Sequence, residues 1–545
     1  MMLKIKVICV KLLIPFLDLH FCESIVQKGH REICESNKLE EIRKARKEIA
    51  GYENSKNSSS AKESFNKFYT TTEVLDRISQ RKINLLITGN KFTKALSISS
   101  GTRTKVWYPM PRSWMKIASE NGISINHKIS HIMYWIIKIA LFLKTCRELF
   151  VVNSSSSSFQ KSEYFQDQQW INNKIVVVGE NPYMAHGEGV SPQGLENFEN
   201  WLKKRSGLAE TVNFNSLELQ NISEWTLAQV GKHEIEVPIV KRLIILTQAL
   251  RLFYLRKLQI GLSLYLFLNY SEIVSVLRVL DSVTQPPGKI VIFNNSHGIS
   301  KPLWANLYER MGIRVCLLFY SIEEEPHFLT GSAATNELWQ LSRWKEFWVI
   351  DEIQRFKTLN PLSESKASSY IVGVPWWTDT DIRIEVTKLK SVAIFDFEPH
   401  VGHFGLTTYN SYGYQDPAKS SELLRGIVEE CAQLGLMVRH KPKRDIRSRR
   451  HRLYQETLEN LATKYPNNYS LIDSRVASSR LIYESDACIS IAFTTTSITA
   501  TQLNKPSAFY AMSARMSDKH PRESTIPLFN TQPDLGTWIS KQLLN

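Results

Sequence analysis

Residues 488–510 read CISIAFTTTSITATQLNKPSAFY, an apolar run that turns abruptly into threonine and serine. Ile489, Ile491 and Phe493 have the spacing of one strand face, and the run as a whole is as apolar as a buried parallel strand. The hydroxyl residues then stand where a helix would begin. Backbone amides and hydroxyls at a helix N-terminus bind phosphate, although the same residues also make an ordinary cap. The stretch therefore predicts a cap or an anion site at the end of a buried strand.

A basic segment follows a second apolar run upstream. Leu434 to Val438 has the character of a strand, and Arg439-His440-Lys441-Pro442-Lys443-Arg444 comes directly after it. In open α/β sheets, ligands bind at the carboxyl ends of strands. Residues 439–452 hold eight Lys or Arg and one Asp, so we expect most of this run to be solvated and assign a site only to its residues up to Arg444. One strand end with cations and one with amides and hydroxyls would suit a nucleotide diphosphate.

Short β-rich runs alternate with helix-like segments along the chain, which predicts an α/β fold with parallel sheets and crossover helices. The predicted division is an N-terminal, partly helical segment of unknown role (1–80), a first α/β lobe (81–377), a charged linker (378–390) and a second α/β lobe (391–545). Within the first segment, residues 32–50 are predicted to be helical and residues 54–64 to be a polar loop. The clearest predicted strands are residues 174–179 and 289–293 in the first lobe, and 391–396, 434–438, 469–472 and 487–493 in the second.

Four segments of the C-terminal half resemble the bacterial polysaccharide biosynthesis proteins named for a PFTS motif. They are Ala492-Phe493-Thr494-Thr495-Thr496, Lys441-Pro442-Lys443-Arg444, residues 294–320 and Gly373-Val374-Pro375-Trp376-Trp377. This chain has Ala492 where the motif has Pro, and Thr495 where it has Ser. The resemblance implies two Rossmann-like lobes that face a cleft, the GT-B type of glycosyltransferase. Bacterial sialyltransferases and teichoic acid polymerases are more distant relatives with a similar basic-Pro segment and Ser/Thr turn.

The resemblance also implies roles for residues of the second lobe, on which it places a nucleotide-sugar donor. Lys441, Lys443 and Arg444 would neutralise the leaving diphosphate, and Thr494, Thr495, Thr496 and Ser497 would donate hydrogen bonds to it. Stabilisation of the leaving group by these residues would require no metal ion and no cofactor. The Asp379-Thr380-Asp381 pair lies in the predicted linker, where we expect it to be solvated.

Further candidates follow other predicted strands. Glu398 and His400 come after the first strand of the second lobe and would bind the ribose or base of the donor, unless Pro399 simply makes a turn. An inverting transferase needs a general base for the acceptor hydroxyl, and the candidates are His297, Glu323 and Glu324. Tryptophans are frequent in the same region, and we expect one or two of them to stack on a sugar; they are Trp304, Trp339, Trp344, Trp348, Trp376 and Trp377.

Composition is that of a globular protein, with 43% hydrophobic and 22% charged residues in a chain of 545. The net charge of +15 indicates an anionic partner, such as a nucleotide sugar, an acidic glycan, a phospholipid surface or a nucleic acid. No nucleic-acid-reading motif is present, so we do not expect nucleic acid. The seven cysteines are scattered without metal-ligand spacing, which predicts reduced thiols in a cytoplasmic protein and no zinc or iron site.

Two basic amphipathic helices are predicted at residues 129–152 and 240–257, where Lys and Arg interrupt long apolar runs. Helices of this kind either pack one face on a core or lie on an anionic membrane. The second alternative predicts a cytoplasmic protein, peripheral on the inner face of the membrane, with a glycan or lipid-linked acceptor. The first 22 residues loosely imitate a signal peptide, but lysines interrupt them and no small-residue cleavage site follows, so we interpret them as a buried segment rather than a signal anchor.

Three functions are consistent with these patterns. The favoured one is a metal-independent glycosyltransferase of surface polysaccharide biosynthesis. A nucleotide-sugar epimerase or hydrolase of the same fold would need further carboxylates in the cleft. A non-catalytic protein that binds acidic glycan or nucleic acid through residues 439–452 would show steep salt dependence and no turnover.

Overall fold

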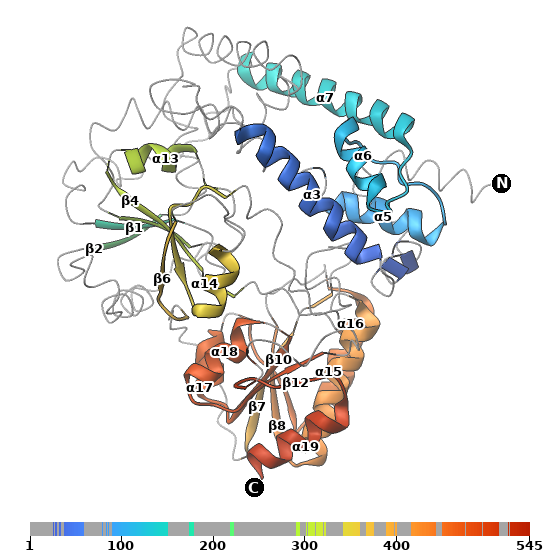
Figure 1. Cartoon of the computed structure of the whole chain (residues 1–545). Helices are drawn as coiled ribbons and strands as arrows, with labels where there is room; N and C mark the ends of the chain where they lie inside the picture. Colours follow the sequence, from blue (N-terminus) through green and yellow to red (C-terminus); the bar gives the residue numbers. More distant parts are fainter. Residues whose placement is uncertain are drawn as a thin grey trace.

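A computed structural model gives the fold, and two lobes and a helical unit are visible in it (Figure 1). The residues that the structure describes are 38–58, 90–150, 174–178, 218–222, 290–294, 301, 303–310, 312–319, 321–322, 342–359, 367–374, 389–396, 398–399, 416–442, 450–474, 476–492, 494–511, 522, 524–544 and single positions between 26 and 86. The predicted amphipathic helix at residues 240–257, the N-terminal 22 residues and most of the linker at 378–390 lie outside this set.

The first lobe contains a six-stranded sheet whose strands are all parallel. Its order is β2 (Glu218–Ile222), β1 (Lys174–Val178), β3 (Ile290–Asn294), β4 (Arg314–Leu318), β5 (Glu346–Val349) and β6 (Ser368–Ile371). Helices α13 (Leu303–Arg310) and α14 (Glu352–Leu359) connect successive strands. The predicted strands at residues 174–179 and 289–293 are confirmed as β1 and β3. The buried side chains of β3, β4 and β5 form the centre of this lobe's core.

The second lobe contains another six-stranded parallel sheet. Its order is β12 (Leu528–Phe529), β11 (Ser507–Tyr510), β10 (Ala487–Ile491), β7 (Ser391–Phe395), β8 (Met437–Lys441) and β9 (Tyr469–Leu471). Every residue of β7, β10 and β11 is buried. The central strands are therefore the ones whose sequences are apolar on both faces, as parallel pairing between helices requires.

Among the described residues, five helices cover this second sheet, and three of them begin with a side-chain cap. They are α15 (Pro417–Gln433), α16 (Arg452–Lys464), α17 (Ser478–Tyr483), α18 (Thr495–Gln502) and α19 (Gln532–Leu543). Asp416 caps α15, His451 caps α16 and Thr531 caps α19. Pro at the first or second position of α15 and α19 adds the preferred start signal. The lobe is thus an α/β unit whose helix starts follow ordinary capping rules, with α17 and α18 as exceptions.

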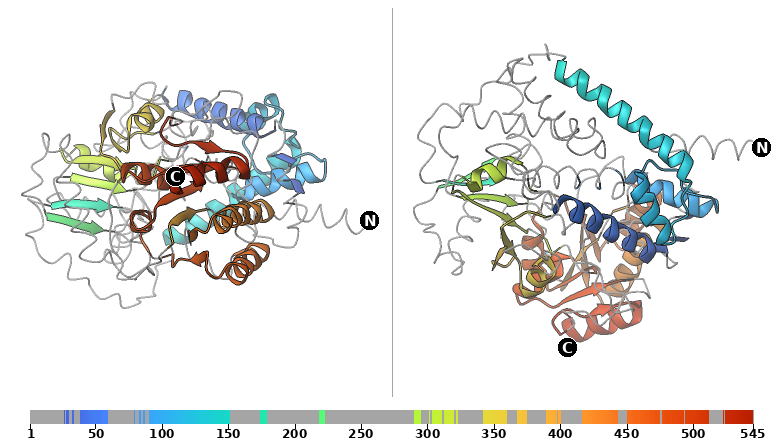
Figure 2. Two further views of the ribbon diagram at one scale, coloured as in Figure 1. Left: turned by 90° about the horizontal axis from the view of Figure 1, so that it is seen from below. Right: turned by 45° about the horizontal axis from the view of Figure 1, so that its top comes forward.

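The N-terminal part of the chain is a helical unit rather than part of the first sheet. It contains α3 (Lys38–Ser58), α5 (Asn90–Gly101), α6 (Arg112–Glu120) and α7 (His127–Phe150). Helices α3 and α6 contact each other, and the fully buried Trp114 donates a hydrogen bond from Nε1 to Glu53 at 2.8 Å. Figures 1 and 2 show these helices grouped on one side of the molecule.

Helix α6 packs on α3 across the division predicted at residue 80. One prediction for this region was wrong. The polar loop predicted from Asn54 is helical as far as Ser58, where the chain continues α3 beyond the buried Glu53. The helix predicted at residues 129–152 is confirmed as α7. Among the described residues, no helix combines the length and hydropathy that crossing a bilayer requires.

Three cysteines of the described residues are free and buried. Cys316 lies in β4, Cys431 in α15 and Cys488 in β10, and each is completely removed from solvent. Burial raises the pKa of all three thiols, to about 12 for Cys431. These thiols behave as small core side chains rather than as reactive groups.

Candidate functional site

Helix α18 begins directly after the central strand β10, and its start differs from those of α15, α16 and α19. Thr494 occupies the N-cap position in an extended conformation, yet its side chain makes no capping hydrogen bond. Its hydroxyl lies instead 3.0 Å from the carbonyl of Ile491 and 2.8 Å from the Oγ of Ser490. A residue type that normally caps a helix is thus turned away from the amides of the first turn. Those amides and the positive end of the helix dipole are presented to the carboxyl edge of the sheet, where an anion would bind.

The residues of the predicted hydroxyl cluster, 494–497, have two different roles. Ser497 is fully buried, with its hydroxyl 2.6 Å from the Oγ of Ser490 and 3.1 Å from the carbonyl of Ala508. Thr494, Thr495 and Thr496 are only partly buried. Ser497 therefore ties α18 to β10 and β11, and the three threonines are left as the part of the cluster that a ligand would reach.

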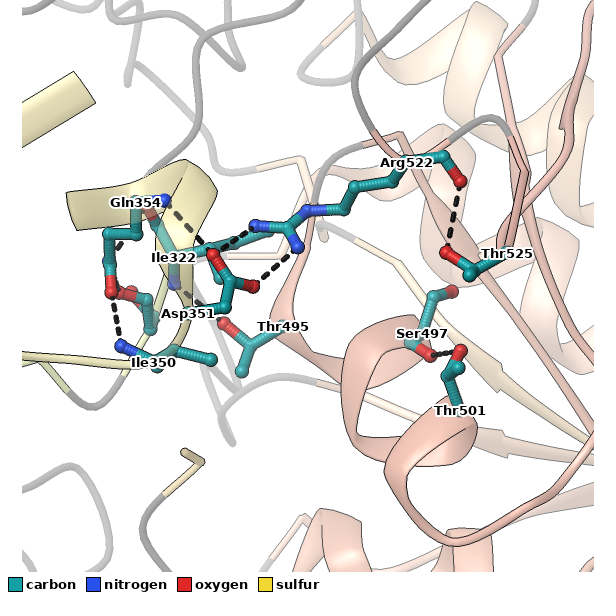
Figure 3. A network of polar contacts seen from close by, with 10 residues as sticks. Ile322, Ile350, Asp351, Gln354, Thr495, Ser497, Thr501, Arg522 and Thr525 are labelled. Atoms are coloured by element: carbon teal, nitrogen blue, oxygen red, sulfur yellow. Dashed lines mark hydrogen bonds and ion pairs between the residues drawn. The ribbon is translucent and has the colours of Figure 1, made fainter. Parts of the chain in front are cut away.

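Thr495 joins the two lobes (Figure 3). Its Oγ1 accepts a hydrogen bond of 3.0 Å from the backbone amide of Ile322, which follows β4 in the first lobe. Gln354 of α14 holds that segment through a side-chain amide that donates to the carbonyls of Ser321 and Ile322, at 2.9 and 3.0 Å. The motif position that is Ser in the family is therefore an interlobe contact, and the threonine of this chain supplies the same hydroxyl.

An ion pair lies beside this contact. Arg522 of the second lobe pairs through both terminal nitrogens with Asp351, which directly follows β5 of the first lobe, with Nη2 3.1 Å from Oδ1. The side chain of Arg522 is 7% exposed and that of Asp351 is 26% exposed. The ends of β4, β5 and β10 thus meet, so the carboxyl edges of the two sheets face each other. This is the arrangement of a GT-B fold.

The first residues of the basic segment belong to a strand, whereas the sequence suggested that they follow one. Strand β8 runs from Met437 to Lys441, so Arg439, His440 and Lys441 are strand residues, and all three are buried. The prediction of a strand that ends at Val438 with cations beyond it was wrong, because each polar side chain has a partner inside the lobe. Arg439 donates to the carbonyl of Glu484 at 2.8 Å, and the Nζ of Lys441 lies 3.3 Å from the carbonyl of Pro442. Lys443 and Arg444 lie outside the described residues.

A buried polar network that the sequence analysis missed lies at the ends of β7 and β8. His440 lies between the carboxylate of Asp396 (Nε2 to Oδ1, 3.0 Å) and the hydroxyl of Tyr469 (Nδ1 to Oη, 2.9 Å). Tyr454 of α16 donates to the other oxygen of Asp396. Burial, and then the charge of Asp396, raise the pKa of both tyrosines. The network joins the end of β7 to β8, β9 and α16, and each of its polar groups depends on the others.

Glu398 lies directly beyond this network and is almost completely buried. Its Oε1 accepts hydrogen bonds from Arg450, at 2.7 Å from Nε and 2.6 Å from Nη2. Its Oε2 has no hydrogen-bond partner among the residues that the structure describes. Burial raises the pKa of Glu398 to about 7, and the positive charge of Arg450 opposes that rise. The carboxyl therefore has one oxygen held by Arg450 and one that is buried without a partner among the described residues, which calls for an explanation.

The remaining predicted residues are placed as follows. His297, Glu323, Glu324 and His400 lie outside the described residues, although Ile322 at the interlobe contact directly precedes Glu323. Trp344 and Trp348 are core residues, with 1% and 0% exposure, so they do not stack on a sugar. The other four tryptophans of that region have no described side chain. No group of three metal-binding side chains occurs in the parts of the chain that are described.

Comparison with solved structures returns distant two-lobed proteins. The UDP-GlcNAc 2-epimerase of Methanocaldococcus jannaschii is 10% identical, with a TM-score of 0.35 over 68% of this chain and 93% of that one. The spinosyn rhamnosyltransferase SpnG, in complex with spinosyn aglycone, is 14% identical, with a TM-score of 0.30 over 68% and 92%. MurG of Acinetobacter baumannii is 9% identical, with a TM-score of 0.25 over 68% and 90%. At this distance no substrate or mechanism transfers to this chain.

No curated protein sequence matches the chain. A family model does: the polysaccharide biosynthesis PFTS motif protein matches residues 253–539, which is more than half of the 545 residues. The matched range runs from the first lobe through the interlobe contact to α19, and it includes the motif-bearing turn at residues 492–495. The chain therefore belongs to the polysaccharide biosynthesis PFTS motif protein family.

Proposed function

We propose that this protein is a glycosyltransferase of surface polysaccharide biosynthesis. It transfers a sugar from a nucleotide-sugar donor to a glycan or lipid-linked acceptor and needs no metal ion for this step. The observation that carries the proposal is the uncapped start of α18, which lies where the carboxyl edges of two parallel sheets meet. A helix start in this place supplies fixed amide dipoles to the anion that departs when the glycosidic bond to the donor breaks.

The leaving nucleoside diphosphate would lie against the first turn of α18. The partly buried hydroxyls of Thr494 and Thr496, which are 3.1 Å apart, border that turn. Lys443 and Arg444 would supply positive charge from the loop that follows β8. Each added donor or cation is worth most where water is excluded, and the opposite lobe provides that exclusion by closing over the same turn through Ile322.

Glu398 would bind the nucleoside end of the donor. Its Oε1 is held by Arg450, so the carboxyl group keeps one orientation, and Oε2 is left to accept from a ribose hydroxyl or a base amine. Asp396 and the His440 network fix the strand ends from which Glu398 projects. The general base remains to be chosen among His297, Glu323 and Glu324, of which Glu323 is adjacent in sequence to the interlobe contact.

A thermal-shift screen tests the donor site. Purified protein is heated with UDP, GDP, CDP, CMP and their sugars, with and without EDTA, and a ligand that binds only the folded state raises the melting temperature. We expect one base to give a clear shift that EDTA leaves unchanged, and Lys443→Ala to reduce it. The exposed Lys464→Ala serves as the matched control. A shift that EDTA abolishes contradicts metal independence, and the absence of a shift with every nucleotide contradicts the donor site.

Product analysis with the donor so identified then separates the three enzymatic alternatives. Transfer yields a new glycoside only when acceptor glycan or lipid extract is present. Hydrolysis yields free sugar without acceptor, and epimerisation yields a changed sugar nucleotide. Either of the last two results, without any transfer product, would overturn the proposal while leaving the nucleotide site intact.

A further inference from the structure

Helix α7 has two apolar faces, one buried against the described helical unit and one exposed. Met133 and Tyr134, which are 2% and 8% exposed, lie on the side toward the helical unit, where α7 contacts α6. On the other side, Ile132, Trp135, Ile136 and Ile139 are 60%, 51%, 49% and 56% exposed. Their spacing of three, four and seven residues places them in one row along the helix, here called the α7 stripe.

A row of this kind is unusual on a folded protein. Single exposed apolar side chains are ordinary, but a contiguous apolar patch marks a surface that binds something. Elsewhere in the described part of the chain, large exposed hydrophobic residues are scattered one to an element, for example Phe356 on α14, Leu471 on β9 and Tyr483 on α17. Figure 1 and the right-hand view of Figure 2 show α7 along the outer side of the molecule, remote from the second lobe.

The segment that carries the stripe is rich in positive charge. Residues 101–150 hold eight Lys or Arg and two Glu, so this segment contributes +6 of the chain's net +15. Lys128, on the first turn of α7, is exposed, as are Arg103, Lys105 and Lys116 on the adjoining segments. An exposed apolar helix face that contains Trp, on a basic segment with an exposed lysine at the start of the helix, is complementary to a bilayer surface of anionic lipid, into which the apolar side chains enter while cations meet the headgroups.

We propose that the α7 stripe docks this protein on an anionic phospholipid bilayer. The helix lies parallel to the membrane plane, with the stripe in the headgroup region and the second lobe directed away from it. The proposal is independent of sugar transfer, because vesicle binding requires neither donor nor acceptor.

Co-sedimentation with vesicles tests the proposal on the full chain. The protein is mixed with vesicles of equal parts phosphatidylglycerol and phosphatidylcholine, and separately with pure phosphatidylcholine vesicles. The test variant is Ile136→Ser combined with Ile139→Ser, and the matched control is Leu471→Ser combined with Tyr483→Ser on the second lobe. Circular dichroism and melting temperature verify that both variants fold as the parent does, which we expect because all four positions are exposed.

We expect the parent to bind the anionic vesicles, and to bind less as salt screens the cations. The α7 variant should partition about tenfold more weakly, because it removes two of the four inserting side chains, and the control should bind as the parent. Failure of the parent to bind anionic vesicles overturns the proposal. Undiminished binding by the α7 variant overturns it as well, because another surface then carries the contact. If light scattering shows a dimer that the α7 variant alone dissolves, with vesicle binding unchanged, a second copy of the chain occupies the stripe instead.

Discussion

The ends of β8 and β10 have similar sequence patterns but different structural roles in the second lobe. Both are apolar runs that end in polar residues on neighbouring parts of one sheet. At β8 the polar residues remain in the strand, and His440 is completely buried between Asp396 and Tyr469. At β10 the polar residues leave the strand, turn into α18 and reach the opposite lobe through Thr495.

The difference follows from side-chain size and charge. A histidine or arginine can be buried only if other parts of the chain bring a partner for each polar atom, so β8 is bound into a network. Serine and threonine are small and can bond to the local backbone, as Thr494 does with Ile491, so they leave the helix start open. One strand end thus serves stability, and the other serves the interlobe junction. Four substitutions test this contrast.

The largest effect is expected at the β8 end from Asp396→Ala. The substitution leaves His440 and Tyr454 buried without their shared partner, and breaking such a network costs about 3–5 kcal/mol in the free energy of unfolding. Chemical denaturation measures this loss. Glu456→Ala, which removes an exposed ion pair with Arg452, is the control and should cost at most about 0.5 kcal/mol. If the two variants are equally stable, the β8 network is not what holds this end of the sheet.

Glu398→Gln should flatten the dependence of stability on pH. The pKa of Glu398 is raised to about 7 in the folded protein from an ordinary 4.5, so between these values the folded state binds more protons than the unfolded state. Its contribution is complete below about pH 4.5 and is lost as the pH rises through about 7, which amounts to about 2.5 kcal/mol between roughly pH 5 and pH 8. Denaturation at both pH values should show this fall in the parent and not in the variant. An equally steep fall in both proteins would exclude Glu398 as its source.

Arg522→Met should loosen the junction between the lobes. It removes the ion pair with Asp351 but retains much of the side-chain volume, and the expected cost is about 1–2 kcal/mol because the pair is only partly exposed. Melting temperature reports the cost, and small-angle scattering should show an expanded molecule. Arg355→Met, which breaks a more exposed pair with Glu352 on α14, provides the comparison. Unchanged scattering together with unchanged stability would show that the ion pair does not hold the lobes.

The smallest effect is expected from Thr495→Val, and Thr495→Ser is its matched control. Valine cannot accept the hydrogen bond from Ile322, at a cost of about 1 kcal/mol, whereas serine keeps the oxygen and should behave as the parent. The valine variant should also weaken nucleotide binding, which isothermal titration would measure. If valine behaves as the parent does, the hydroxyl of Thr495 does not stabilise this contact.

Much of the second lobe follows from local sequence. The apolar run at residues 487–493 predicted β10, and the hydroxyl residues after it predicted the start of α18, because a buried parallel strand and a helix start both have local signals. Strand β8 was displaced by three residues, because Arg439, His440 and Lys441 are polar and their partners lie far away in the chain. A buried strand that contains histidine can be recognised only once Asp396 and Tyr469 are known to flank it.

Prediction of the candidate site meets the same limit, because local sequence does not reveal partners that are distant in the chain. Glu398 was predicted near the site from its place after a strand, but its partner Arg450 belongs to a basic run that was expected to be solvated. Charge density along the sequence cannot distinguish a residue that turns inward from neighbours that do not. The interlobe contacts of Thr495 and Arg522 join residues separated by 173 and 171 positions, so no local pattern could have revealed them.

The buried thiols of Cys316, Cys431 and Cys488 can report the local opening of each lobe. A thiol that is inaccessible and has a raised pKa reacts with an alkylating reagent only during an opening of the surrounding core. Cys316 belongs to the first sheet, and the other two belong to the second lobe. Mass spectrometry of the alkylated peptides that contain them would therefore measure the rate of local opening of each lobe separately within one molecule, without any introduced label.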